Sequence, residues 1–244
     1  MPLALAVGPL LGALMLDELD FASVFAACGF IAVAALFCFS LVSCPPVHNT
    51  HARFQLKTML EIRVGRLFVF MLLLCIGYGG VVAFAPLYAP QVGFDSAAPL
   101  FSAWAIGAVL ARIPGGRLYD SLGPKLPGLV GLVLLVVGWL ALGLWHSKFG
   151  MVASAGVLGF GFGLLMPGVQ AMAVDLVKPA RRGAANATLF SAFDVGIAIG
   201  AMGFGQLAKV ADLSVVFLIS SGLAAVGICV YLFWVIPHFN HNRL

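Results

Sequence analysis

An aspartate lies in the middle of a long apolar stretch of this sequence. Residues 183–208 contain no charged side chain except Asp194, which would lie about 17 Å along a helix that begins at residue 183. A carboxylate inside a membrane span is unfavourable, and it usually serves an ion or proton path or binds a polar partner. Two interpretations follow: Asp194 carries protons in a watery cavity, or it is a structural acid bonded to the backbone or to a neighbour.

Three further side chains are candidates for the wall of such a cavity. Gln170 follows Pro167 in the run 149–174, and it either faces the cavity or satisfies backbone groups that the proline frees. Tyr78 and Trp104 lie mid-way along two other apolar runs. These aromatic rings either stack on a lipophilic substrate or only pack between helices.

A segment rich in glycine and charge, residues 112–125, separates two apolar runs and forms a predicted loop. It contains the spacing G-x-x-x-D-x-x-G-x-[KR]. Glycines permit a tight turn, and Asp120 is able to meet Arg side chains in one conformational state and not in another. The segment resembles the loop signature of the major facilitator superfamily, in its copy between helices eight and nine. The resemblance implies a cytoplasmic gate made of Arg112, Gly116, Arg117, Asp120, Gly123 and Lys125, with Arg181 or Arg182 as ionic partner.

Two other segments resemble parts of the drug-exporter-like members of this superfamily. Residues 4–13 are similar to the fifth-helix antiporter signature, and residues 181–200 are similar to the loop and eleventh helix of these exporters. Small residues at such spacing let helices cross closely. The predicted helix-packing motif comprises Gly8, Pro9, Gly12, Gly196 and Gly200.

The composition restricts the kind of protein that can hold these residues. Of the 244 residues, 62% are apolar and 9% are charged, whereas a soluble domain has about 25% charged residues. A soluble enzyme, a nucleic-acid binder and a disordered chain are therefore excluded. The cysteines and histidines form neither a disulfide framework nor a metal-ligand array. We expect no enzymatic activity, no metal, no cofactor and no nucleic-acid partner.

Seven runs with at most one charged residue are long enough, or nearly so, to cross a bilayer as helices. They are residues 22–43, 67–89, 96–111, 126–145, 149–174, 183–208 and 213–236. Residues 2–16 form a shorter apolar stretch, which we interpret as a helix whose beginning is missing. The predicted fold is an all-α integral membrane bundle with seven full transmembrane helices and an N-terminal partial helix. Tyr231 is expected to anchor a span end at the membrane interface.

Positive charges fall on alternate loops and predict the orientation. Eleven of the 13 Lys and Arg residues lie on one side of the predicted spans, which the positive-inside rule makes cytoplasmic. The other side holds Lys148 and Lys209. A multi-pass protein of the plasma (inner) membrane with a cytoplasmic C-terminus is expected.

The first hairpin aligns with the last when the chain is shifted by 192 positions. Asp20 then meets Asp212 and Phe25 meets Phe217, although chance matches are common in such a composition. A repeat of this length divides the chain into the end of an N-terminal bundle (1–43), a central cytoplasmic loop (44–66), a six-helix C-terminal bundle (67–237) and a tail (238–244).

The resemblance implies a secondary transporter that works by alternating access. Proton-coupled efflux of a small, lipophilic molecule is the expected activity, with a proton gradient in place of a cofactor. The expected partners are a small-molecule substrate, the lipid bilayer and the missing N-terminal helices of the same transporter. The alternatives are an uptake symporter or facilitator for a sugar or organic acid, and a truncated membrane scaffold or partner subunit that does not transport.

Overall fold

The computed structural model describes residues 12, 15, 20–42 and 60–243, and this part of the chain is helical throughout apart from its connections. Within these residues, seven helices are long and apolar enough to cross a membrane, as the sequence predicts. Gly8 and Pro9 lie outside the described residues. The partial helix expected over residues 2–16 is represented by the helical positions Gly12 and Met15.

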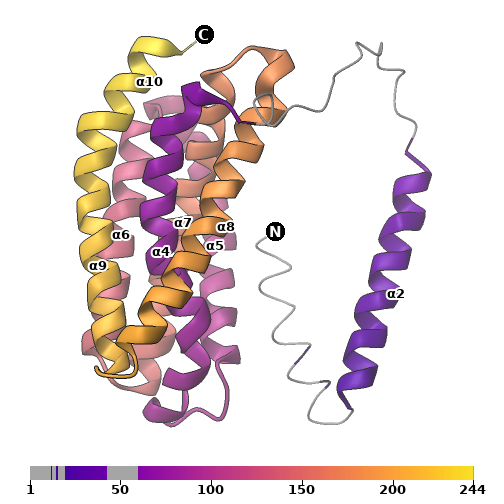
Figure 1. The fold of residues 1–244 in the computed structure, drawn as a ribbon, viewed down its shortest axis with the longest axis vertical. Coiled ribbons are helices and arrows are strands. Elements are labelled where there is room, and N and C mark those ends of the chain that lie inside the picture. Colours follow the sequence, from indigo (N-terminus) through magenta and orange to yellow (C-terminus); the bar gives the residue numbers. More distant parts are fainter. Residues whose placement is uncertain (1–11, 13–14, 16–19, 43–59, 244) are drawn as a thin grey trace.

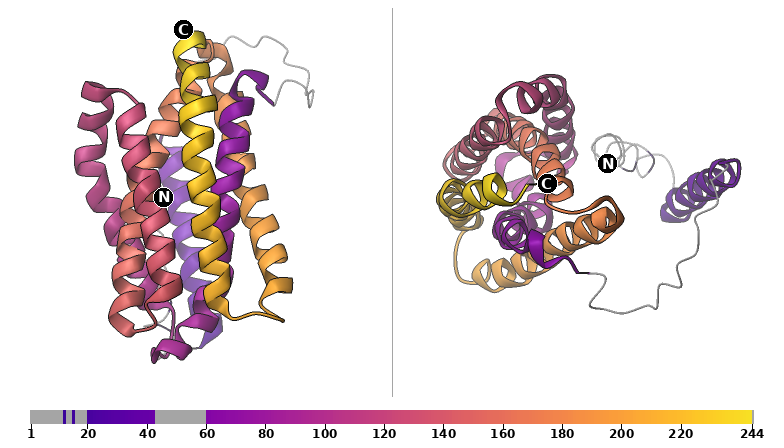
Figure 2. Two further views of the ribbon diagram at one scale, coloured as in Figure 1. Left: turned by 90° about the vertical axis from the view of Figure 1, so that its left-hand side faces the viewer. Right: turned by 90° about the horizontal axis from the view of Figure 1, so that it is seen from above.

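Six of the seven membrane-spanning helices form one bundle (Figures 1 and 2). They are α4 (Gly65–Tyr88), α5 (Ala98–Leu122), α6 (Lys125–Leu144), α7 (Lys148–Asp175), α8 (Arg182–Leu207) and α9 (Leu213–Val230), which continues through a π-helical turn, η4 (Tyr231–Val235), into α10 (Ile236–Asn242). Short 3-10 turns, η1 (Ile62–Val64), η2 (Pro90–Val92) and η3 (Pro179–Arg181), lie in the connections.

Close helix pairs hold the bundle together. The most extensive contacts join α5 to α7 and α4 to α8, while α6 packs between α7 and α9. Small residues make these approaches possible: a Cβ on Gly200 would overlap the carbonyl oxygen of Ile76, and one on Gly163 would lie 2.7 Å from that of Ala108. In lipid, helices associate through such packing because the bilayer is as apolar as their side chains.

The remaining described span, α2 (Phe21–Ser40), buries none of its residues. Figure 1 shows it beside the bundle rather than within it. Asp20 caps its first turn, accepting a hydrogen bond from the Ser23 amide at 3.0 Å. The residue 192 positions later, Asp212, occupies the corresponding position before α9. Both helices therefore start one residue after an aspartate, at positions 192 residues apart.

Three sequence-based expectations differ from the structure. Residues 112–122 are not a loop but the last turns of α5, because the chain turns only at Gly123 and Pro124. The expected tail from residue 238 is largely helical, since α10 continues the last span to Asn242. Tyr231 is 1% exposed rather than interfacial, and its hydroxyl donates a hydrogen bond to the carbonyl oxygen of Pro124 at 2.6 Å.

Candidate functional site

A cavity of about 380 Å³ opens between α4, α5, α7 and α8. All four side chains predicted to face a cavity line it: Asp194, Gln170, Trp104 and Tyr78. The complete lining is Tyr78, Trp104, Ala105, Ala108, Arg112, Phe162, Gly163, Met166, Pro167, Gln170, Phe190, Phe193 and Asp194. The structure thus brings residues from four different predicted spans to one place.

Helical periodicity explains which residues each helix presents to the cavity. Trp104, Ala108 and Arg112 follow one another at intervals of four residues along α5, so they share one face of that helix. Phe190 and Asp194 have the same spacing on α8. Helix α7 approaches α5 closely, because Gly159 lies directly against the backbone of Trp104.

Aromatic rings form one wall of the cavity. The ring of Tyr78 lies 5.0 Å from that of Trp104, 5.4 Å from Phe162 and 5.6 Å from Phe193, measured between centroids. Tyr78 and Trp104 are 9% and 7% exposed. The rings are tilted against one another, as aromatic pairs prefer. Most of this wall is therefore a preformed apolar surface.

Sequence reasoning missed two of these rings, Phe162 and Phe193. Phe193 immediately precedes Asp194, but that position alone does not place it on the cavity side. Phe162 lies in the glycine-rich part of α7, and the neighbouring glycines predict close helix packing at this position instead of a cavity wall. Only the arrangement of α7 and α8 around Tyr78 brings both rings into the site.

The cavity holds side chains of opposite charge. Asp194 enters it from α8 and Arg112 from α5, and both are exposed. Neither forms a hydrogen bond or an ion pair with any residue in the described ranges 20–42 and 60–243. Arg112, which the motif assigned to the cytoplasmic gate, is therefore also a cavity residue. Gln170 adds an amide on the α7 side.

The other predicted gate residues gather where α5 ends and α6 begins. Arg117 and Asp120 are exposed on the last turns of α5, and Lys125 is the first residue of α6. Gly123 has φ +70° and ψ −177°, a conformation that essentially only glycine adopts. A Cβ on Gly116 would meet no atom within 4 Å, so this glycine faces open space here.

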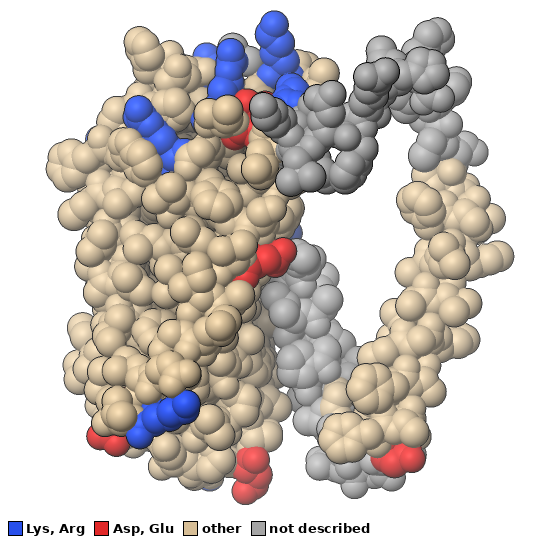
Figure 3. Space-filling model, in the orientation of Figure 1, with Lys and Arg blue, Asp and Glu red and all other residues tan. Residues whose placement is uncertain are grey.

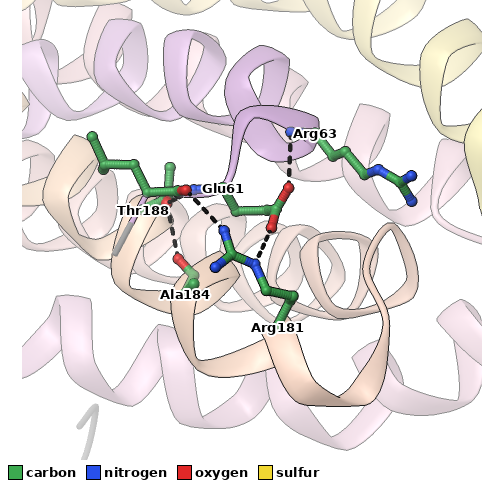
Figure 4. Close-up of polar contacts among 6 residues, drawn as sticks. Glu61, Arg63, Arg181, Ala184 and Thr188 are labelled. Carbon is green, nitrogen blue, oxygen red and sulfur yellow. Dashed lines mark hydrogen bonds and ion pairs between the residues drawn. The ribbon is translucent and has the colours of Figure 1, made fainter. Parts of the chain in front are cut away.

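Arg181 contacts the end of the central connection instead of Asp120. Its Nε donates to Oε2 of Glu61 at 2.8 Å, and an Nη donates to the carbonyl oxygen of Leu60 at 3.1 Å (Figure 4). The Glu61 amide in turn donates to the hydroxyl of Thr188 at 2.9 Å. The Arg181 guanidinium holds the pKa of Glu61 below its usual value, against a smaller opposing effect of burial. Arg182, the first residue of α8, is exposed.

The small residues of α8 lie against α4. A Cβ on Gly196 would lie 2.6 Å from the Cβ of Cys75, and Gly200 faces the Ile76 backbone. Gly12, in contrast, has no atom within 4 Å of its would-be Cβ. The face of α8 that holds the bundle together is thus different from the face that presents Asp194.

The space-filling view shows where the charged side chains lie on one face of the molecule (Figure 3). Most visible Lys and Arg side chains gather at the end of the bundle that holds the C-terminus, and the middle is largely uncharged. This distribution matches that of a multi-pass membrane protein, whose basic loops gather on one side.

Comparison with known proteins agrees with this architecture. The sequence model described as Major Facilitator Superfamily matches residues 96–243, which is well over half of the chain. The chain belongs to the major facilitator superfamily. Membership in this family of transporters confirms that the chain is not an enzyme.

Two relatives in the superfamily show the extent of the match. An uncharacterized MFS-type transporter, YhhS of Salmonella enteritidis, is 25% identical over 172 residues, covering 68% of this chain and 42% of its own. The quinolone resistance protein NorA of Staphylococcus aureus is 30% identical over 135 residues, covering 52% of this chain and 34% of its own. The chain therefore spans less than half the length of these relatives.

Solved transporters of similar fold include the nucleoside transporter NupG, with a TM-score of 0.62 and 20% identity over 95% of this chain and 64% of that one. A POT family transporter in complex with 5-aminolevulinic acid has a TM-score of 0.66 and 21% identity, over 78% of this chain and 43% of that one. At these identities the likeness shows the fold alone.

Proposed function

We propose that this protein is part of a secondary transporter that exports a small, lipophilic molecule in exchange for protons. The observation that carries the proposal is the position of Asp194 in a cavity that also has a wall of aromatic rings. Aromatic rings provide apolar contact area for the substrate. An acid half-way along a span is suited to accept and release a proton.

The predicted repeat is also the basis on which we propose the remaining parts of the transporter. We infer that residues 1–43 correspond to helices five and six of the N-terminal half, residues 44–66 to the central cytoplasmic loop and residues 67–237 to the core of the C-terminal half. The N-terminal helices that this chain lacks would form the other wall of the cavity. Alternating access then consists of rocking one half against the other around the site.

Export is preferred over uptake for two reasons. The opening segment resembles the antiporter signature, and the chain resembles NorA, whose name records resistance to quinolones.

Basic residues gather at the end of the bundle that holds the C-terminus, which supports a cytoplasmic C-terminus in the plasma membrane.

Energised dye efflux tests the proposal. Cells that produce the protein together with its N-terminal helices are loaded separately with ethidium, fluorescein and rhodamine B, which differ in charge. We expect at least one dye to leave these cells faster than control cells, and a protonophore to abolish the difference. Asp194→Asn should abolish it as well, with the protein still in the membrane.

Two outcomes would contradict export by proton exchange. Faster accumulation of a dye would indicate uptake, the main alternative activity. Efflux that is unaffected by both the protonophore and Asp194→Asn would show that no proton gradient drives it. Asp175→Asn is a matched control, because Asp175 is an exposed acid at the end of α7 outside the cavity.

A further inference from the structure

We infer that the substrate of this cavity is an aromatic zwitterion, a planar molecule with an anionic group at one end and a cationic group at the other. The inference rests on the proposed function and narrows its substrate class, from a lipophilic molecule in general to one whose apolar rings carry two opposite charges. It follows from the pair of charges that the cavity presents, from their positions on two different helices, and from the aromatic wall beside them.

The two charges belong to different helices, each of which packs mainly along another helix. Arg112 lies on α5, which packs along α7, while Asp194 lies on α8, which packs along α4. Their side chains are not paired with each other, since no ion pair within 4 Å joins them in the part of the chain that the structure describes. Each charge is therefore available to a ligand from its own side of the cavity.

The sign of the charges selects among ligands. In a partly apolar site, charges interact more strongly than in bulk water. An organic cation would be attracted by Asp194 but repelled by Arg112. An organic anion would be attracted by Arg112 but repelled by Asp194. A molecule that carries a cationic and an anionic group pairs with both side chains. A singly charged competitor is repelled by one of them, and this repulsion disfavours its binding. A neutral apolar molecule would leave both charges without a ligand contact.

The aromatic wall selects the body of the ligand. Trp104, Tyr78, Phe162 and Phe193 form a continuous cluster with neighbouring ring centroids 5.0 to 5.6 Å apart. A sugar requires many hydrogen-bonding groups, whereas the polar side chains of the lining are Asp194, Arg112, Gln170 and the Tyr78 phenol. The part of the site that these helices form measures about 380 Å³, which lies within the usual range for small-molecule sites, and the N-terminal helices would add a further wall.

Binding of three matched probes to the purified protein tests the inference. The probes are naphthoate, naphthylmethylamine and aminomethylnaphthoate, which carries both charged groups at opposite ends of the fused rings. Isothermal titration calorimetry gives the dissociation constant of each. We expect aminomethylnaphthoate to bind about tenfold or more tightly than either singly charged probe, because it gains one further charge-assisted contact.

Two variants assign each charge to its ligand group. Asp194→Asn should weaken aminomethylnaphthoate about tenfold while leaving naphthoate bound at least as well as before. Arg112→Gln should weaken aminomethylnaphthoate to a similar extent while leaving naphthylmethylamine unharmed. Arg112→Lys keeps the charge and should keep the preference, which guards against a variant that only fails to fold. Asp175→Asn should change none of the three constants.

Several outcomes would overturn the inference. Equal binding of naphthylmethylamine and aminomethylnaphthoate would make the substrate class organic cations, and equal binding of naphthoate would make it anions. Absence of binding by all three probes would also reject it. The dye-efflux measurement is independent of these titrations, so proton-driven efflux without a preference for the zwitterion would reject the substrate class alone.

Discussion

Gly159 lies so close to Trp104 that a Cβ on the glycine would overlap the Trp104 carbonyl oxygen. This contact joins α7 to α5 and fixes the backbone that presents the Trp104 ring to the cavity. A single small residue in one helix thus positions an aromatic side chain of another.

Gly159→Ala should destabilise the bundle and disturb the cavity. Overpacking against backbone forces the helices apart and lowers the free energy of unfolding by about 1–3 kcal/mol. Thermal unfolding of the purified protein should show a lower midpoint, and affinity for aromatic ligands should fall. Gly156→Ala is the matched control, because the nearest atom to its Cβ would be the Ala103 carbonyl oxygen at 3.9 Å. A loss of stability in the control as large as that of Gly159→Ala would contradict this explanation.

The turn between α5 and α6 should be sensitive to replacement of Gly123. Its positive φ with an extended ψ is strained for any side chain, and Gly123→Ala should lower the free energy of unfolding by about 1–3 kcal/mol. The measurement is again the unfolding midpoint. An unchanged midpoint would mean that the turn relaxes into another conformation.

Gly116→Ala separates packing from gating. With open space around Gly116 and helical backbone on either side, alanine should raise helix stability by up to about 1 kcal/mol in this state. If the gate closes by bringing another helix against Gly116, transport should nevertheless fall. A variant that is more stable and transports at the normal rate would remove Gly116 from the gate.

Asp120→Asn should lower transport while the protein remains in the membrane. Asp120 is exposed at the end of α5 and forms no ion pair within the described part of the chain, so its loss should leave the bundle intact. Dye efflux and the amount of protein in the membrane are measured together. The control is Asp95→Asn, because Asp95 is an exposed acid in the connection before α5. Undiminished efflux by Asp120→Asn would count against the gate role.

The ion pair between Glu61 and Arg181 should stabilise the protein in a pH-dependent way. Because Arg181 lowers the pKa of Glu61 in the folded protein, the stabilisation is present at neutral pH and is lost as the pH falls through that lowered value, below about pH 4.5. The Arg181 side chain is 37% exposed, so the pair contributes about 1 kcal/mol or less.

Thermal unfolding of wild type and Glu61→Gln across pH measures this contribution. The wild type should be more stable at pH 7, and the two midpoints should converge as the pH falls through the acid range. Thr188→Val tests the neighbouring hydrogen bond without changing charge, and its effect should not depend on pH. A difference between wild type and Glu61→Gln that persists at low pH would show that the effect does not come from ionisation.

The sequence by itself determined the class of the protein and the number of its spans. Apolar runs of about 20 residues can only be buried in lipid as helices, and the intervening charges mark their ends. It also singled out Asp194 and three companions, because a polar group in an apolar run requires an explanation.

Only the tertiary structure decided which of these residues meet. Periodicity fixes the residues that share a face of one helix, but the rotation of each helix and the choice of its neighbours depend on packing between small residues. For this reason the sequence predicts Arg112 in a loop, whereas in the structure it lies on α5 and lines the cavity. For the same reason the pairing of Arg181 with Glu61, 120 positions apart, was not visible in the sequence.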